Sequence, residues 1–226
     1  MYGNLLKALS SSIQTTLSRA TNNLVRDGFR EDEKIATGKY EFDRSLTEFV
    51  VPTTCAYIGR SAFLSSSLRK IYIPDSVVAM GKGVFMDCHL LSEVRLSESI
   101  RELPDLAFIS CSSLTSVRIP NSVMWIGTQC FMHCSKLSNV TMTENLAEIG
   151  SEVFSDCGSL EKVRMPSTLP CIPGDVAKDS NTIVHIDEST VIIYDPIVPR
   201  IESRFVQEKR ARKPGHEMSY RHYPDV

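Results

Sequence analysis

The sequence predicts a solenoid of stacked coils, with parallel β-strands on one face and irregular or short helical returns on the other. Leucine recurs every 22 or 23 residues through the middle of the chain, and phenylalanine and cysteine follow at matching intervals. The leucines are Leu46, Leu68, Leu91, Leu114, Leu137 and Leu160. The phenylalanines are Phe63, Phe85, Phe108, Phe131 and Phe154, and the cysteines are Cys88, Cys111, Cys134 and Cys157. A fixed period of this length indicates a repeat protein, because a single coil cannot bury its apolar residues alone.

The composition excludes several classes of protein. The chain has 226 residues with 25 Lys and Arg against 27 Asp and Glu, a net charge of −2, so it is not a generally basic nucleic-acid binder. Its apolar runs are far shorter than the ~18 residues that span a membrane. The odd count of 7 cysteines leaves no fully paired disulfide framework within one chain.

Within one repeat, the pattern L-x-x-V-x-I alternates apolar and polar residues, which predicts a half-buried strand. A proline then ends the strand, because it cannot donate to the hydrogen-bond ladder. These prolines are Pro52, Pro74, Pro120 and Pro166. A glycine follows where we expect a sharp turn, at Gly59, Gly81, Gly127 and Gly150. The stretch up to the phenylalanine is short, so it predicts one helical turn or an irregular arc.

The run from Leu114 to Cys134, LTSVRIPNSVMWIGTQCFMHC, resembles the BspA-like leucine-rich repeat, also called the Treponema pallidum type. The resemblance covers residues 46–182 and implies a leucine-rich-repeat solenoid of six units, each ending in a Phe-x-x-Cys element. It also implies that the repeat cysteine is a small buried residue. Some units depart from the pattern, with Ser97 and Pro104 in the third and Pro173 and Ser180 in the sixth.

Residues 1–26 predict an amphipathic helix. Its apolar positions recur every three or four residues, at Leu5, Leu9, Ile13, Leu17, Ala20 and Leu24. The helix either caps the first coil or forms a targeting segment, because the stretch carries Lys7, Arg19 and Arg26 with no acid, as mitochondrial transit peptides do. Residues 27–45 read as a polar connector that contains a degenerate coil at Tyr40 and Phe42.

The other end of the solenoid also needs a cap. Residues 183–198 contain two short apolar runs, 183–186 and 191–194, which predict a C-terminal β cap as a hairpin or as paired strands. Residues 199–226 form a polar tail with a basic cluster at 209–213. The tail is either simply solvated or an arm that becomes ordered on a larger partner.

No constellation of catalytic or metal-binding residues stands out. The cysteine column lacks the C-x(2–4)-C spacing typical of zinc sites. Cys130, His133 and Cys134 lie close in sequence, but both cysteines occupy columns of the packing pattern. No phosphate-binding loop, nucleophile elbow or H-E-x-x-H motif occurs. We therefore expect no enzyme activity, no cofactor, no metal and no small-molecule substrate.

The exposed positions of the predicted strands carry the functional information. They alternate with the buried columns and hold five cations and two acids over the six repeats. The candidate partner-binding residues are Lys70, Tyr72, Glu93, Arg95, Arg118, Lys162 and Arg164. This face is either a solvated surface or a docking site for an acidic protein segment, since arginine and tyrosine are enriched in binding hot spots. Nucleic acid is disfavoured, because no aromatic stacking pattern accompanies the cations.

Three functions remain open. The first is a structural or accessory subunit of a larger assembly, held through both terminal segments, and the second is a free, reversible interaction module. The third, a surface adhesin, is implied by the resemblance, although no secretion signal is evident because Lys7 interrupts the only leucine cluster. We therefore expect an intracellular, chiefly cytoplasmic protein, with mitochondrial import through 1–26 or nuclear import through 209–213 as alternatives.

Overall fold

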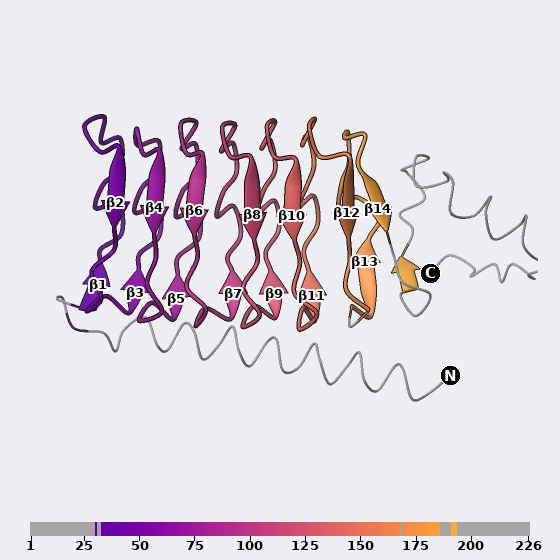
Figure 1. Ribbon diagram of the computed structural model, residues 1–226, viewed down its shortest axis with the longest axis horizontal. Helices are drawn as coiled ribbons and strands as arrows, with labels where there is room; N and C mark the ends of the chain where they lie inside the picture. The colour runs from indigo at the N-terminus through magenta and orange to yellow at the C-terminus, as the bar shows by residue number, and fades with distance from the viewer. Residues whose placement is uncertain (1–29, 31–32, 168, 186–190, 194–226) are drawn as a thin grey trace, which may run out of the picture. The chain divides into compact units, whose positions relative to one another are not determined.

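A computed structural model shows a parallel β-solenoid of about seven coils and describes residues 30, 33–167, 169–185 and 191–193 (Figure 1). One strand of each coil lies on what we call the strand face. These strands are β2 (Glu48–Val50), β4 (Lys70–Tyr72), β6 (Glu93–Arg95), β8 (Ser116–Arg118), β10 (Asn139–Thr141), β12 (Lys162–Arg164) and β14 (Ile183–His185). The predicted parallel solenoid is therefore confirmed.

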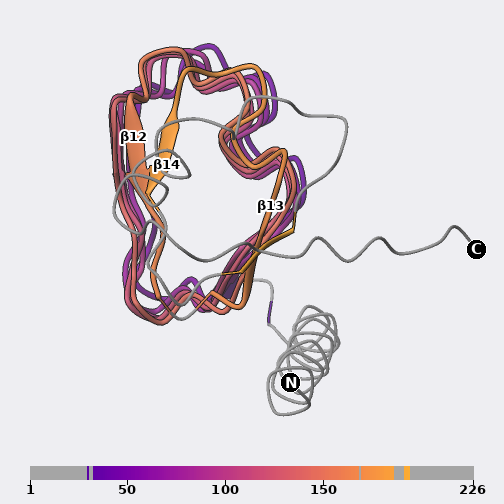
Figure 2. The same cartoon turned by 90° about the vertical axis from the view of Figure 1, so that its right-hand side faces the viewer.

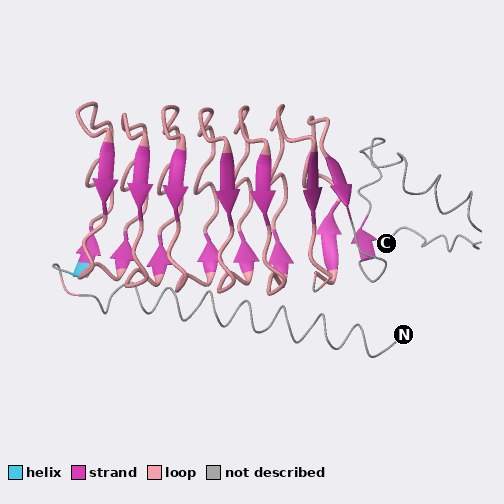
Figure 3. Cartoon of the chain, viewed as in Figure 1, coloured by secondary structure: helices cyan, strands magenta, loops and turns pink. Residues whose placement is uncertain are grey.

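The opposite side, the return face, carries a second series of short strands that the sequence did not predict (Figure 2). They are β1 (Lys34–Ile35), β3 (Tyr57–Ile58), β5 (Ala79–Met80), β7 (Glu102–Leu103), β9 (Trp125–Ile126), β11 (Glu148–Ile149), β13 (Cys171–Pro173) and β15 (Val191–Ile193). Strands and irregular turns make up these returns, and the alternative of short helical returns is wrong (Figure 3).

The strand pairing follows the repeat. Lys70 of β4 lies opposite Glu48 of β2 and Glu93 of β6, one repeat to either side. The strand face consists of three hydrogen-bonded sheets, β2-β4-β6, β8-β10 and β12-β14, so the ladder is interrupted twice. Strands β14 and β15 pair in parallel with β12 and β13 rather than with each other. Of the two expected arrangements the hairpin is therefore wrong, and the two strands extend both faces by one coil.

The phenylalanine column fills the interior. The rings of Phe108 and Phe131 stack with centroids 5.3 Å apart and an angle of 4° between their planes. Tyr40 continues the stack, with its ring centroid 5.2 Å from that of Phe63, so residues 33–45 form a coil that lacks the repeat signature. Every phenylalanine of the column is fully buried, which makes the stack the centre of one continuous core.

The arc around each phenylalanine explains why the returns are not helical. The Phe131 N–H donates to the Val153 carbonyl of the next coil at 3.0 Å, and not to a carbonyl within its own coil. Gln129 and His133, two residues before and after it, have φ of 57° and 62°. Left-handed residues on both sides of the phenylalanine turn the chain and exclude a right-handed helical turn.

The repeat glycines have a different role from the expected sharp turn. Among the described glycines, only Gly38 and Gly83 have positive φ. A Cβ atom on Gly127 would lie 2.4 Å from the backbone nitrogen of Asp105, and one on Gly81 would lie 2.3 Å from that of Arg60. The glycine column therefore permits the backbones of adjacent coils to approach closely. The predicted segments 1–26 and 199–226 lie outside the described residues.

Candidate functional site

The outward side chains of the strand face form two columns. In each three-residue strand the central side chain points inward and the outer two point to solvent, as in β8, where Val117 is buried and Ser116 and Arg118 are exposed. All seven candidate residues lie in these columns. The first column is Glu48, Lys70, Glu93, Ser116, Asn139, Lys162 and Ile183. The second is Val50, Tyr72, Arg95, Arg118, Thr141, Arg164 and His185.

Cations in the first half of the surface have partners within it. The Lys70 ammonium lies 3.3 Å from the Glu93 carboxylate on the neighbouring strand. The Arg95 guanidinium lies over the Tyr72 ring, with Cζ 4.7 Å from the ring centroid. A cation over an aromatic face is attracted by the ring quadrupole. These contacts reduce the capacity of Lys70 and Arg95 to attract a partner.

Arg118 is also paired. Its guanidinium forms an ion pair with Glu98, which follows β6 in the turn before the return strand. Arg95 and Arg118 are neighbours in the second column, where two like charges on adjacent strands repel each other. The structure gives each its own local partner, so this repulsion has compensation within the chain.

The second half of the surface is different. Lys162 and Arg164 on β12 are exposed, and no acid of the described residues lies within ion-pair distance of either. Their neighbours on the adjacent strands are Asn139, Thr141, Ile183 and His185. None of these is acidic. Of the strand-face Lys and Arg side chains that the structure describes, three form no ion pair, and two of these three, Lys162 and Arg164, lie together on β12, the third being Arg95.

His185 is a member of this group that sequence reasoning did not select. It lies directly opposite Arg164 in the pairing of β14 with β12. The available signal was the spacing of Ile183, which keeps the repeat beyond the sixth unit. The signal was incomplete, because the Phe-x-x-Cys element of that unit is degenerate.

The cysteine column has a structural role. The thiol of Cys88 donates to the backbone carbonyl of Phe63, one coil earlier, at 2.9 Å, and Cys157 donates to that of Phe131 at 3.1 Å. Burial raises the pKa of Cys88 to about 11 and that of Cys157 to about 12. A thiol with so high a pKa stays protonated at neutral pH and is a poor nucleophile and metal ligand.

The cluster of Cys130, His133 and Cys134 does not assemble into a site. Both cysteines are fully buried in the core, whereas the exposed His133 ring has Nδ1 3.2 Å from the Asp156 carboxylate. Within the described ranges, no group of three or more His, Cys, Asp or Glu side chains could hold a metal ion.

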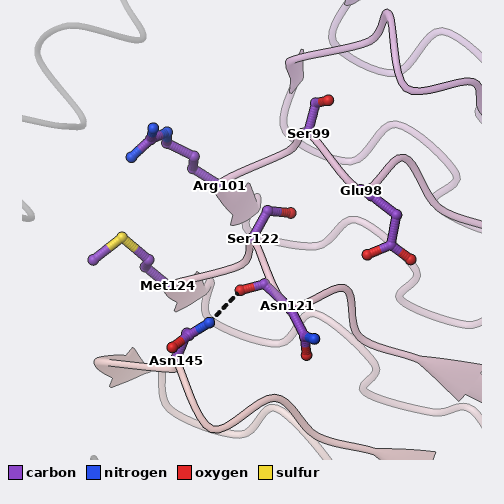
Figure 4. A pocket seen from close by; sticks show the side chains of 7 residues that line it. All are labelled: Glu98, Ser99, Arg101, Asn121, Ser122, Met124 and Asn145. Atoms are coloured by element: carbon purple, nitrogen blue, oxygen red, sulfur yellow. Dashed lines mark hydrogen bonds between the residues drawn. The ribbon is translucent and has the colours of Figure 1, made fainter.

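An open depression of about 510 Å³ lies in the turns that follow β6, β8 and β10 (Figure 4). The Asn145 side-chain amide donates to the Asn121 carbonyl across it at 2.8 Å. Its lining is Glu98, Ser99, Arg101, Asn121, Ser122, Met124 and Asn145. This set contains no histidine and no cysteine.

No helix among the described residues has the length and apolar character needed to cross a membrane. The stacked coils and their polar strand face are those of a repeat scaffold.

Comparison with known proteins identifies the family. The model of the BspA type leucine rich repeat region matches residues 31–90 and 56–184, with 6 copies of the repeat. The chain therefore belongs to the BspA-type leucine-rich repeat family. No curated protein matches the sequence.

Solved structures agree with this fold. The chain is similar to the leucine-rich repeat protein TpLRR of T. pallidum, with a TM-score of 0.68 and 24% identity over 84% of this chain and 92% of that one. It also resembles a leucine-rich repeat protein from Eubacterium ventriosum, with a TM-score of 0.58 and 21% identity over 76% of this chain and 50% of that one. At these identities the likeness concerns the fold alone.

Proposed function

We propose that the chain is a non-enzymatic protein-interaction scaffold whose strand face binds an acidic protein segment at β12 and β14. The observation that carries this proposal is the contrast between the two halves of the face. Lys70, Arg95 and Arg118 have partners within the chain, whereas Lys162 and Arg164 are exposed and form no ion pair with an acid of the described residues.

The chemistry of β12 and β14 suits carboxylate groups. The planar guanidinium of Arg164 can hold a carboxylate through two parallel hydrogen bonds, and the Lys162 ammonium adds a second positive charge two residues away along the same strand. His185 lies opposite Arg164 and offers a ring nitrogen as a further hydrogen-bonding group. An extended segment with two or three acidic side chains would match this spacing.

Nucleic acid is the other polyanion that these cations could attract. Continuous single-stranded binding uses a series of aromatic side chains on which bases stack. Among the strand-face residues that the structure describes, Tyr72 and His185 are the only aromatic ones, and Arg95 already covers the Tyr72 ring. Protein is therefore the partner class that the geometry favours.

A scaffold of this kind can act as a free module or as a subunit of a larger assembly. Size-exclusion of a native extract distinguishes the two, because a module elutes near its own 25.3 kDa and a subunit elutes in a large particle. Affinity purification from the same extract should yield co-purifying proteins, and these proteins should remain bound to the chain after nuclease treatment. Purification of the chain without any protein partner, or loss of the partners on nuclease treatment, would contradict the proposal.

A further inference from the structure

The outer side of the return face carries apolar side chains that are not part of the interior core. In each two-residue return strand, the second residue points into the core and the first points outward. Outward positions in β3, β5 and β9 hold Tyr57, Ala79 and Trp125. Tyr57 is 7% exposed and Ala79 is 4% exposed, yet neither belongs to the interior cluster. A side chain on the outside of a sheet is buried to this degree where something lies over it.

Two more apolar residues extend this surface. Val78 and Met124, which directly precede Ala79 and Trp125, are 41% and 43% exposed. Figure 4 shows the Met124 side chain beside that of Arg101, with both directed away from the coil. We call Tyr57, Val78, Ala79, Met124 and Trp125 the return-face patch. Arg101 and Glu102 at β7 separate the β3–β5 part of this patch from the β9 part. Apolar parts of a sheet face are normally covered by another layer.

We propose that the return-face patch is the docking surface for an amphipathic helix, and that residues 5–25 of the same chain supply this helix. The sequence of this segment has one apolar face, with apolar residues every three or four positions and Ser, Thr, Asn and Gln opposite. A helix laid across one face of a sheet is a common way to bury both apolar surfaces. The helix would then lie along the solenoid and not over the open end of its first coil.

The lengths agree. A helix of about 20 residues is roughly 30 Å long at 1.5 Å per residue. Seven return strands, from β1 to β13, span six steps of about 4.8 Å, or roughly 29 Å. Eight residues, 26–33, separate the segment from the start of β1 at Lys34, so it can reach the patch from the first return strand without crossing the solenoid.

The charges agree as well. From β1 to β11, the outward and preceding positions of the return strands hold three acids and two cations, Glu33, Glu102 and Glu148 against Lys34 and Arg101. Residues 1–26 carry three cations, Lys7, Arg19 and Arg26, and no acid. Opposite charges on the two surfaces favour this pairing and oppose an acidic occupant.

The single tryptophan of the chain, Trp125, lies in the patch. Its fluorescence therefore shows whether another segment shields the patch from solvent. We would replace Leu9 and Leu17 by Asp in the full chain, and compare a control with Ser11→Asp and Thr15→Asp, which adds the same charges to the polar face. The proposal predicts that only Leu9→Asp/Leu17→Asp shifts Trp125 emission to longer wavelength and increases its quenching by acrylamide. Identical spectra for the two variants would overturn it.

Hydrogen exchange tests the same contact from the patch side. Val78→Asp with Met124→Asp should abolish slow amide exchange in residues 5–25, whereas Leu90→Asp, at a residue 40% exposed outside the patch, should not. The solenoid amides should stay protected in both variants. Unprotected exchange of residues 5–25 in the unsubstituted chain would overturn the proposal. So would protection that is lost on dilution as a dimer becomes a monomer, because the helix would then come from a second copy.

Discussion

The thiol of Cys134 donates a hydrogen bond to the backbone carbonyl of Phe108, one coil earlier, at 3.1 Å. The same bond joins Cys111 to Phe85, at 3.2 Å. The phenylalanine therefore contributes its ring to the interior stack and its carbonyl to the next cysteine. This relationship gives a physical reason why Phe and Cys recur together at a fixed spacing.

The first prediction concerns thiol reactivity. Burial raises the pKa of the Cys111 and Cys134 thiols well above the ordinary value, so almost no thiolate is present at pH 8. We expect alkylation of Cys88, Cys111, Cys134 and Cys157 to be far slower in the native protein than in denaturant, as measured by peptide mass spectrometry. Rapid native labelling of these four residues would contradict the assignment.

The second prediction concerns alkaline stability. The Cys88 pKa is about 11 and the Cys157 pKa about 12 in the folded chain, against an ordinary value of 9.0. Because the folded-state pKa is raised, the stabilising contribution is fully present below pH 9 and is lost as pH rises toward 11 to 12. Within that window, each rise of one pH unit should lower the free energy of unfolding by about 1.4 kcal/mol for each of the two thiols. Denaturant titrations from pH 8 to 11 measure this loss, and replacing Cys88 by Ala should reduce its slope.

The third prediction concerns the aromatic stack. Phe131→Ala should lower the free energy of unfolding by about 3–5 kcal/mol, because it removes a fully buried ring between two others. Phe42→Ala is the matched control, since the Phe42 ring is largely exposed, and it should cost less than about 1 kcal/mol. Equal midpoints of urea unfolding for the two variants would contradict the assignment of the core.

The fourth prediction concerns the glycine column. Gly127→Ala should destabilise the chain by about 1–3 kcal/mol or more, because its Cβ would lie 2.4 Å from the Asp105 backbone nitrogen. At Gly158 nothing lies within 4 Å of an added Cβ, so Gly158→Ala should be close to neutral. Thermal unfolding of both variants checks the difference, and a stable Gly127→Ala protein would show that adjacent coils can separate without cost.

The sequence was sufficient to predict the architecture because the packing repeats with the period of the chain. Phe108 and Phe131 occupy equivalent positions in successive coils, so one column of the sequence became one stack in the core. The returns were harder to predict. Left-handed residues such as Gln129 and His133 have no fixed identity, so their column carried no recognisable signal.

The candidate surface was predicted in position but not in charge distribution. Alternation placed Arg118 on the strand face correctly. Its partner Glu98 lies in a turn outside the two columns. Adding the charges at the exposed strand positions therefore included the Arg118 cation but not the acid that compensates it. His185 was missed because the last coil has lost most of the repeat signature.

We propose that acidic partners bind chiefly at β12. We would measure the affinity for a fluorescent peptide of about ten residues rich in Asp and Glu by anisotropy at low salt. The control for Lys162→Glu/Arg164→Glu is Arg95→Glu/Arg118→Glu, which makes the same change of charge on the same face. Circular dichroism should first show that both variants keep the fold.

Lys162→Glu/Arg164→Glu should raise the Kd for this peptide at least about tenfold, or about 1.4 kcal/mol, and remove most of its salt dependence. Arg95→Glu/Arg118→Glu should have a markedly smaller effect, because both arginines already have partners within the chain. Equal losses in the two variants, or an unchanged Kd in the β12 variant, would contradict the claim that β12 provides the binding site.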